Sequence, residues 1–479
     1  MGRLRQELAS GVFYLAVAKY SGLAVQLLVT AVLARLLTPA DFGVVAVATV
    51  IIAFFNILSD IGIGPAIIQD KSLTDHDLSH IFSFTLYTGL ALSAGFFLCA
   101  EPIAAYYDNG ALASVCRWLS LPILFYSLNV VPLNIQYKEK RFRFIAFATL
   151  GVQATAGVCS VWGAAGGMGL YALVMSQVLS SVLLFCIFYL RHALRLHGLT
   201  DLRPLRKIMS FSIYQFLFNL INYFSRNLDK LLIGRFIGMS SLGYYEKSYR
   251  LMLLPLQNIT FVISPAMQPV LSTLQHDLRG LAVRYLKVLR LLAYISFPLS
   301  AFLYSAAEEI IVLFFGSQWM EAAGVFRILA LTVSVQMLTS TSGAVYQSAN
   351  ATRQLFVSGC WGASFMIAGF CVAICCWGSI VAVAYGFLVA QCANTVQCFI
   401  LLFKTLGHPI ASMLRILARP FMAGCALLAL LLAAEPLLPS CGPLPSLSLK
   451  LSVSAIVALL SMRLLGGYDL LRYLSSGKW

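Results

Sequence analysis

Apolar residues occur along the whole chain in runs that short polar segments separate. A helix needs about 20 apolar residues to cross a hydrocarbon core of about 30 Å, and the runs have this length. The pattern therefore predicts an all-α polytopic membrane protein of about 14 transmembrane helices. The predicted spans are residues 11–34, 41–64, 80–100, 112–133, 144–163, 169–190, 209–235, 241–272, 286–306, 322–346, 356–377, 379–402, 414–434 and 447–467.

Composition and charge exclude a soluble globular protein. The chain is 60% hydrophobic and 11% charged, whereas soluble domains carry about 25% charged residues. The formal net charge is +15. In a soluble protein that surplus would indicate nucleic-acid binding, but here the basic residues are sorted between the loops, which is a sign of membrane topology.

With the N-terminus in the cytoplasm, most cations fall in cytoplasmic loops, as the positive-inside rule requires. These loops hold Lys138, Lys140, Arg141, Arg143, Arg191, Arg195, Arg203, Arg206, Lys207, Arg279, Arg284, Lys287, Arg290, Arg353, Lys404, Arg415 and Arg419. The opposite loops hold Glu101, Asp108, Glu308, Glu309, Glu321 and Glu435, with three cations, Arg35, Arg235 and Lys450. The sorting requires an even number of spans, so we expect both termini to be cytoplasmic.

An internal repeat divides the predicted spans into two sets. The matching pairs are Arg35–Gly43 with Arg235–Gly243, Ile63–Ala66 with Ile263–Ala266, Glu101 with Glu309, and Arg117 with Arg327. Each repeat would hold six helices, and an even number gives both the same orientation, so an axis along the membrane normal would relate them. We expect a first lobe at 1–190, a basic cytoplasmic linker at 191–208, a second lobe at 209–403, and two further helices with a cytoplasmic tail at 404–479.

Charged residues inside the predicted spans are the best candidates for a functional site. A charge at the bilayer centre costs about 2.5–3.5 kcal/mol on insertion scales, so it normally faces a polar interior. Five cations against two carboxylates would make a cavity suited to phosphate or pyrophosphate. The candidate cations are Lys19, Arg226, Lys230, Lys247 and Arg250, with Asp229 and Glu246 as carboxylates and Tyr20, Asn219, Asn222 and Tyr223 as polar or aromatic neighbours. The competing interpretation is that these charges form salt bridges between the halves or extend to the helix ends.

Other residues support narrower interpretations. Candidate gating residues are Arg35, Asp60, Arg117, Arg235 and Arg327. His76 and His80 are four residues apart in an acidic loop, a spacing that we interpret as a solvated segment and not as a metal site. The sequence has no GxxxxGK[ST] motif, so it shows no nucleotide-driven motor, and we expect no cofactor.

Four segments carry a resemblance to a known family: Ala34–Gly43, Lys138–Phe142, Asn227–Arg235 and Leu242–Tyr245. With the repeat, they make most of the chain resemble the bacterial Wzx-type polysaccharide flippases, especially the branch of exopolysaccharide and colanic acid exporters, in the multidrug/oligosaccharidyl-lipid/polysaccharide exporter superfamily. The resemblance implies a two-lobed helical bundle in the bacterial inner membrane. It also implies that an undecaprenyl-pyrophosphate-linked oligosaccharide moves to the periplasmic leaflet by alternating access, for exopolysaccharide or lipopolysaccharide biosynthesis. It further implies coupling to a proton or sodium gradient and contact with polymerase and export machinery. From the family we carry over the cationic cavity alone, to Lys19 and Arg226.

Three alternatives stay open at this point. The same superfamily includes multidrug or cation antiporters and the peptidoglycan-precursor flippase. A cation exporter should have a carboxylate-rich cavity, and this sequence leans towards positive charge. A membrane-embedded polymerase would need catalytic groups outside the bilayer, and the longer predicted external segments, Ala307–Ala322 and Glu435–Leu447, offer few. We therefore expect a transporter and not an enzyme.

Overall fold

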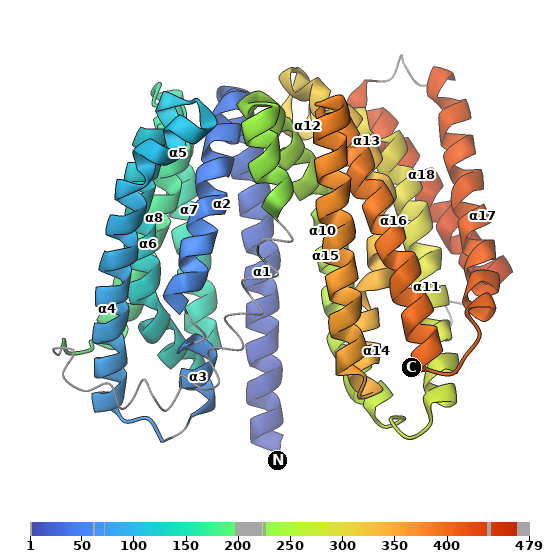
Figure 1. Ribbon diagram of the computed structural model, residues 1–479, viewed down its shortest axis with the longest axis horizontal. Helices are drawn as coiled ribbons and strands as arrows, with labels where there is room; N and C mark the ends of the chain where they lie inside the picture. The colour runs from blue at the N-terminus through green and yellow to red at the C-terminus, as the bar shows by residue number, and fades with distance from the viewer. Residues whose placement is uncertain are drawn as a thin grey trace. The chain divides into compact units, whose positions relative to one another are not determined.

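A computed structural model of the chain describes residues 2–60, 63–70, 72–196, 223, 227–437 and 442–466. The regular structure of these residues is helical, which confirms the predicted all-α class. The chain forms two compact units, Met1–Gly243 and Tyr244–Trp479. Figure 1 colours the helices of both units from blue to red along the chain. The predicted linker falls mostly outside the described residues, so the lobe boundaries remain predictions.

Unit 1 is a bundle of long helices with two short helices at its opposite ends (Figure 1). The helices are α1 (Gly2–Leu36), α2 (Pro39–Asp60), α3 (Ile63–Gln69), α4 (Asp75–Leu98), α5 (Ala100–Tyr107), α6 (Gly110–Lys138), α7 (Phe142–Ala165), α8 (Tyr171–Arg191), a helical stretch at 227–236, and the first turn of α10. Helix α6 packs against α2, α4 and α8, and α7 packs against α1 and α8. Buried side chains of α3, α4 and α6, among them Ile67, Ile81 and Val131, form a core at one end.

Unit 2 holds the rest of α10 (Met239–Ser272) and the remaining helices. These are α11 (Leu278–Ser305), α12 (Ala307–Phe315), the 3-10 turn η1 (Ser317–Trp319), α13 (Met320–Ser340), α14 (Ser342–Ser348), α15 (Thr352–Trp377), α16 (Ile380–Thr405), α17 (Ile410–Ala434), η2 (Glu435–Leu437), α18 (Pro443–Ser461) and η3 (Met462–Gly466). The last two long helices, α17 and α18, pack on α11, and α18 also packs on α12. The predicted additional helices are therefore part of this unit's bundle.

Within the described ranges, twelve helices are long and apolar enough to cross a membrane. They coincide with the first six and the last six predicted spans, and the chain is a multi-pass membrane protein. The eighth predicted span matches α10, although α10 is not among the twelve. The seventh, 209–235, lies mostly outside the described residues.

The short helices α3, α5, α12 and α14 were not predicted, and the second predicted span, 41–64, is too long. Helix α2 ends at Asp60 and α3 starts at Ile63. Pro65 lies in the first turn of α3 and Pro102 in the first turn of α5. Proline lacks the N–H that an internal helical turn needs but is tolerated in a first turn, so the chain starts a new helix at these places.

The repeat is visible where α2 and α10 begin. Helix α2 starts with a capping box, in which the Thr38 hydroxyl and the Asp41 carboxylate bond each other's backbone N–H groups. A Cβ on Gly43 would lie 1.8 Å from the Met239 carbonyl oxygen, and one on Gly243 would lie 2.0 Å from the Pro39 oxygen. Both glycines stand in the same register of the repeat, so each copy supplies the small residue that lets the other copy's backbone approach.

Candidate functional site

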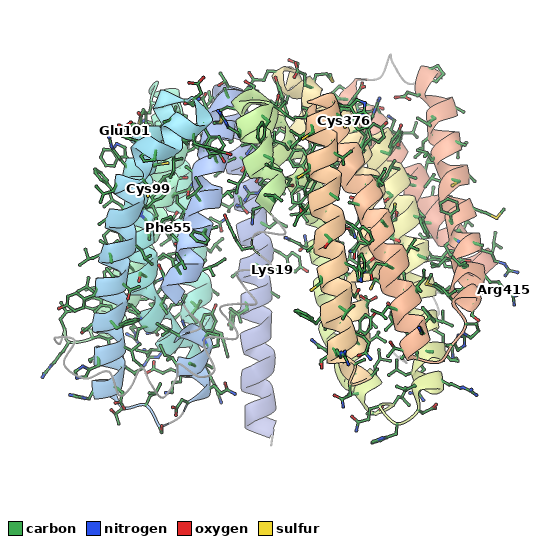
Figure 2. The ribbon with its side chains drawn as sticks, in the orientation of Figure 1. Lys19, Phe55, Cys99, Glu101, Cys376 and Arg415 are labelled. Carbon is green, nitrogen blue, oxygen red and sulfur yellow. The ribbon has the colours of Figure 1, made fainter. Side chains whose placement is uncertain are left out.

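Lys19 and Tyr20 are exposed on α1, inside its membrane-spanning stretch Tyr14–Leu36. The Lys19 ammonium lies 5.9 Å from the centroid of the Tyr20 ring. Figure 2 shows Lys19 partway along the helix, and not at either end. An exposed ammonium at this depth needs polar surroundings, because hydrocarbon solvates it poorly. Among the described candidate cations of unit 1, Lys19 is the exposed one.

Tyr223, Asp229 and Lys230 belong to unit 1, where Tyr223 contacts α2. The buried Tyr223 hydroxyl donates a hydrogen bond to the Val50 carbonyl of α2, and its ring packs 6.0 Å from the ring of Phe54. The Asp229 side chain is only 2% exposed, and its Oδ1 accepts the Lys230 N–H at 2.8 Å. Tyr223 thus packs on α2, while Asp229 is buried and Lys230 is half-buried.

Helix α10 carries the other three predicted charges, and they differ in exposure. Lys247 is 4% exposed, Glu246 is half-buried and Arg250 is exposed. Beside them the rings of Tyr245 and Tyr249 stack with centroids 6.0 Å apart. Of these three, Arg250 is the exposed one.

Three predicted site residues, Arg226, Asn219 and Asn222, lie outside the described residues, as does the side chain of Asp60. Their roles, including the predicted pairing of Arg226 with Asp229, remain predictions.

The candidate gating arginines make contacts within their own units. In unit 1 the Arg117 guanidinium lies 2.5 Å from a Glu101 carboxylate oxygen of α5. In unit 2 Arg327 lies 2.9 Å from Glu308 of α12 and 3.8 Å from Glu435 at the end of α17. The pairs occupy the same place in each repeat, which makes Glu308, and not the predicted Glu309, the structural counterpart of Glu101.

The other two gating candidates are exposed. The Arg235 guanidinium lies 5.1 Å from the Tyr106 ring centroid, and Arg35 is exposed at the end of α1. A gating role is untested for all of these arginines.

A buried ion pair in unit 2 was not predicted as a site. Lys450 of α18 is 2% exposed and donates to a Glu309 oxygen at 2.5 Å and to the Ser305 carbonyl at 2.7 Å. The Ser446 hydroxyl donates to the same Glu309 oxygen at 2.8 Å. Burial raises the pKa of Glu309, but these hydrogen bonds outweigh it, so the pKa lies below its ordinary value. The sequence could have indicated this pair through Lys450, which is one of three cations in the predicted loops opposite the cytoplasm.

A metal centre finds little support in the ranges that the structure describes, where no three His, Cys, Asp or Glu residues gather in a ligating group. The His76 and His80 rings at the start of α4 lie 4.6 Å apart, between centroids.

Comparisons with known proteins identify the family. Residues 32–324 match the family described as "Polysaccharide biosynthesis protein". The teichuronic acid biosynthesis protein TuaB of Bacillus subtilis is 24% identical over 72% of this chain and 72% of its own length. The lipopolysaccharide biosynthesis protein WzxC of Escherichia coli is 25% identical over 84% of this chain and 82% of its own length.

A solved structure shows the same fold. The lipid II flippase MurJ, in an inward closed conformation, superposes with a TM-score of 0.75, at 14% identity, over 96% of this chain and 99% of its own. The family resemblance read from the sequence motifs is confirmed, because the family match spans well over half of the chain. The chain belongs to the polysaccharide biosynthesis protein family of multi-pass membrane proteins.

Proposed function

We propose that this protein is a flippase that moves an undecaprenyl-pyrophosphate-linked oligosaccharide from the cytoplasmic to the periplasmic leaflet of a bacterial inner membrane. The protein works by alternating access, has both termini in the cytoplasm, and draws on a proton or sodium gradient. The oligosaccharide that it brings to the periplasmic leaflet is the substrate of polysaccharide polymerase and export machinery. Two relatives carry names from teichuronic acid and lipopolysaccharide biosynthesis, and a protein of the same fold is called a lipid II flippase.

The exposed Lys19 inside a membrane span is the observation that carries this proposal. A pyrophosphate headgroup needs a cation within the bilayer, and lysine binds phosphate as a point charge. Tyr20 beside it offers a ring and a hydroxyl to a sugar. Arg250 of α10 is an exposed cation of unit 2, and Arg226 stays a predicted site residue.

The non-enzymatic assignment has a separate basis. The segments outside the predicted membrane spans are short, and α5 and α12 carry charges that are already paired, as in Glu101 with Arg117. The relatives and the protein of like fold bear biosynthesis or flippase names. A transporter that serves a biosynthetic pathway accounts for both observations.

The test is the leaflet location of the lipid-linked oligosaccharide in cells that lack this protein. We expect the oligosaccharide to collect on the cytoplasmic face and surface polysaccharide to be lost. Lys19→Ala should reproduce the loss while the protein stays in the membrane, and Lys19→Arg should retain part of the export. Lys404→Ala, which removes an exposed cation at the end of α16, is the matched control.

Two other results would reject the proposal. Normal translocation with failed polymerisation would indicate a polymerase. Unchanged polysaccharide in the deletion strain, together with increased sensitivity to cationic drugs, would indicate a drug or cation antiporter.

A further inference from the structure

Two arginines at one end of unit 1 lie against aromatic rings. The Arg143 guanidinium of α7 lies 5.4 Å from the Tyr14 centroid and 5.7 Å from the Phe147 centroid. The Arg191 guanidinium at the end of α8 lies 5.9 Å from the Phe144 centroid. We call these five residues the Arg143–Arg191 cluster. Three helices supply it, so it is a feature of the folded unit and not of one sequence segment.

Arg143 and Arg191 differ from the neighbouring basic residues Lys138 and Arg141, which are bonded to protein oxygen atoms. Arg141 pairs with Glu139 at 2.9 Å, and Lys138 donates to the Asp70 carbonyl at 2.9 Å. Across the described ranges, neither Arg143 nor Arg191 has a carboxylate oxygen within 4.0 Å, and both are exposed. A guanidinium held over a ring keeps its edge N–H donors available, and these match phosphate oxygens bidentately.

The cluster lies at the level where three membrane spans leave the hydrocarbon. Tyr14 opens the span of α1, Arg143 is the second residue of the span of α7, and Arg191 is the last residue of the span of α8. Apolar side chains at the same level are open: Phe147 is 58% exposed and Leu190 is 81% exposed. In a bilayer acyl chains cover these apolar side chains, so a lipid that also meets the guanidinium groups would place its phosphate above its hydrocarbon chains.

We propose that the Arg143–Arg191 cluster binds the headgroup phosphate of an anionic phospholipid. Its acyl chains lie along Phe147 and Leu190, and the headgroup phosphate meets a guanidinium of the cluster. Basic sites between membrane helices at the cytoplasmic level select anionic headgroups in this way. The bound phospholipid is a resident of the membrane and not the transported molecule, so the site does not depend on the proposed transport.

Lipid binding to the purified full-length protein tests the site. Phosphatidylglycerol or phosphatidylcholine is titrated in detergent, and bound lipids are counted by native mass spectrometry. We expect Arg143→Gln/Arg191→Gln to weaken phosphatidylglycerol binding about tenfold or more, the effect of losing charge-assisted hydrogen bonds. The matched control, Arg279→Gln/Arg284→Gln, removes two exposed charges of α11 and should change binding less than about twofold.

Three outcomes would overturn the proposal. Equal losses in the two double variants would show that net charge alone attracts the lipid. Phosphatidylcholine binding as tightly as phosphatidylglycerol would remove the role of the anionic headgroup. Displacement of phosphatidylglycerol by millimolar inorganic phosphate would identify a site for free anions. The transported lipid is absent from this experiment, so its result is independent of the leaflet assay.

Discussion

Lys450 is a lysine in a mainly apolar helix, and removing its charge should loosen α18. Lys450→Met keeps the length of the side chain but removes the ammonium that donates to the Ser305 carbonyl and pairs with the Glu309 carboxylate. Glu309→Gln removes the partner charge and can still accept a hydrogen bond from Ser446. The double variant replaces the pair by neutral groups of similar volume.

The magnitude follows from the burial of the pair, since the two side chains are 2% and 16% exposed. Breaking a buried ion pair from one side costs about 3–5 kcal/mol, because the remaining charge stays buried without its partner. Replacing both partners is far milder. We therefore expect each single substitution to lower the free energy of unfolding by about 3 kcal/mol, and the double substitution to lower it by much less than the sum.

Equilibrium unfolding in mixed micelles with rising dodecyl sulfate measures these free energies. The matched control is the same cycle on Arg117 and Glu101, whose side chains are 44% and 67% exposed. An exposed pair contributes at most about 1 kcal/mol, so this cycle should show little coupling. If the Lys450 and Glu309 losses add to within about 0.5 kcal/mol, the two groups act independently and the reasoning fails.

Three further predictions concern Gly43, Glu309 and Arg226. Gly43→Ala should destabilise the protein by about 1–3 kcal/mol, because the added Cβ would meet the Met239 backbone. The control is Gly95→Ala, whose Cβ would have nothing within 4 Å and should leave the stability unchanged. Equal shifts of the melting temperature in the two variants would contradict this prediction. Because the folded pKa of Glu309 is lowered, its stabilisation is complete above its ordinary pKa and is lost as the pH falls through the folded pKa. Unfolding of Glu309→Gln should accordingly depend less on acid pH, and an unchanged acid profile would refute that. Arg226→Lys should retain part of the export if Arg226 is a point charge, and abolish it if the contact is bidentate; the leaflet assay decides.

The hydrophobic pattern was sufficient to predict the membrane helices. Apolar runs and the sorting of Lys and Arg report on lipid and water, so they predicted the twelve spans that the structure describes. The internal spacing also predicted that Arg117 and Arg327 are equivalent, and each has an acidic partner on the preceding short helix. Patterns of this kind need no knowledge of which helices touch.

Side-chain partners were harder to predict, because they depend on the packing of distant segments. Glu308 and Glu309 are adjacent, and only the rotation of α12 determines that one faces Arg327 and the other faces Lys450. Tyr223 looked suited to a sugar, but its hydroxyl bonds the backbone of α2, 173 residues away in sequence. The short helices α3 and α5 escaped notice because a single proline in a first turn gives little signal.

The contact between the first turns of α2 and α10 has a further consequence. Residue 43 meets residue 239 and residue 243 meets residue 39, which is the self-complementary rule of a two-fold homodimer interface. Two separate copies of a single six-helix ancestor could have met in this way before their genes joined. In such a dimer one mutation would have altered both sides at once. In one continuous chain the two copies can differ at the same position, and here Thr38 caps one helix whereas Gly238, at φ +119°, precedes the other.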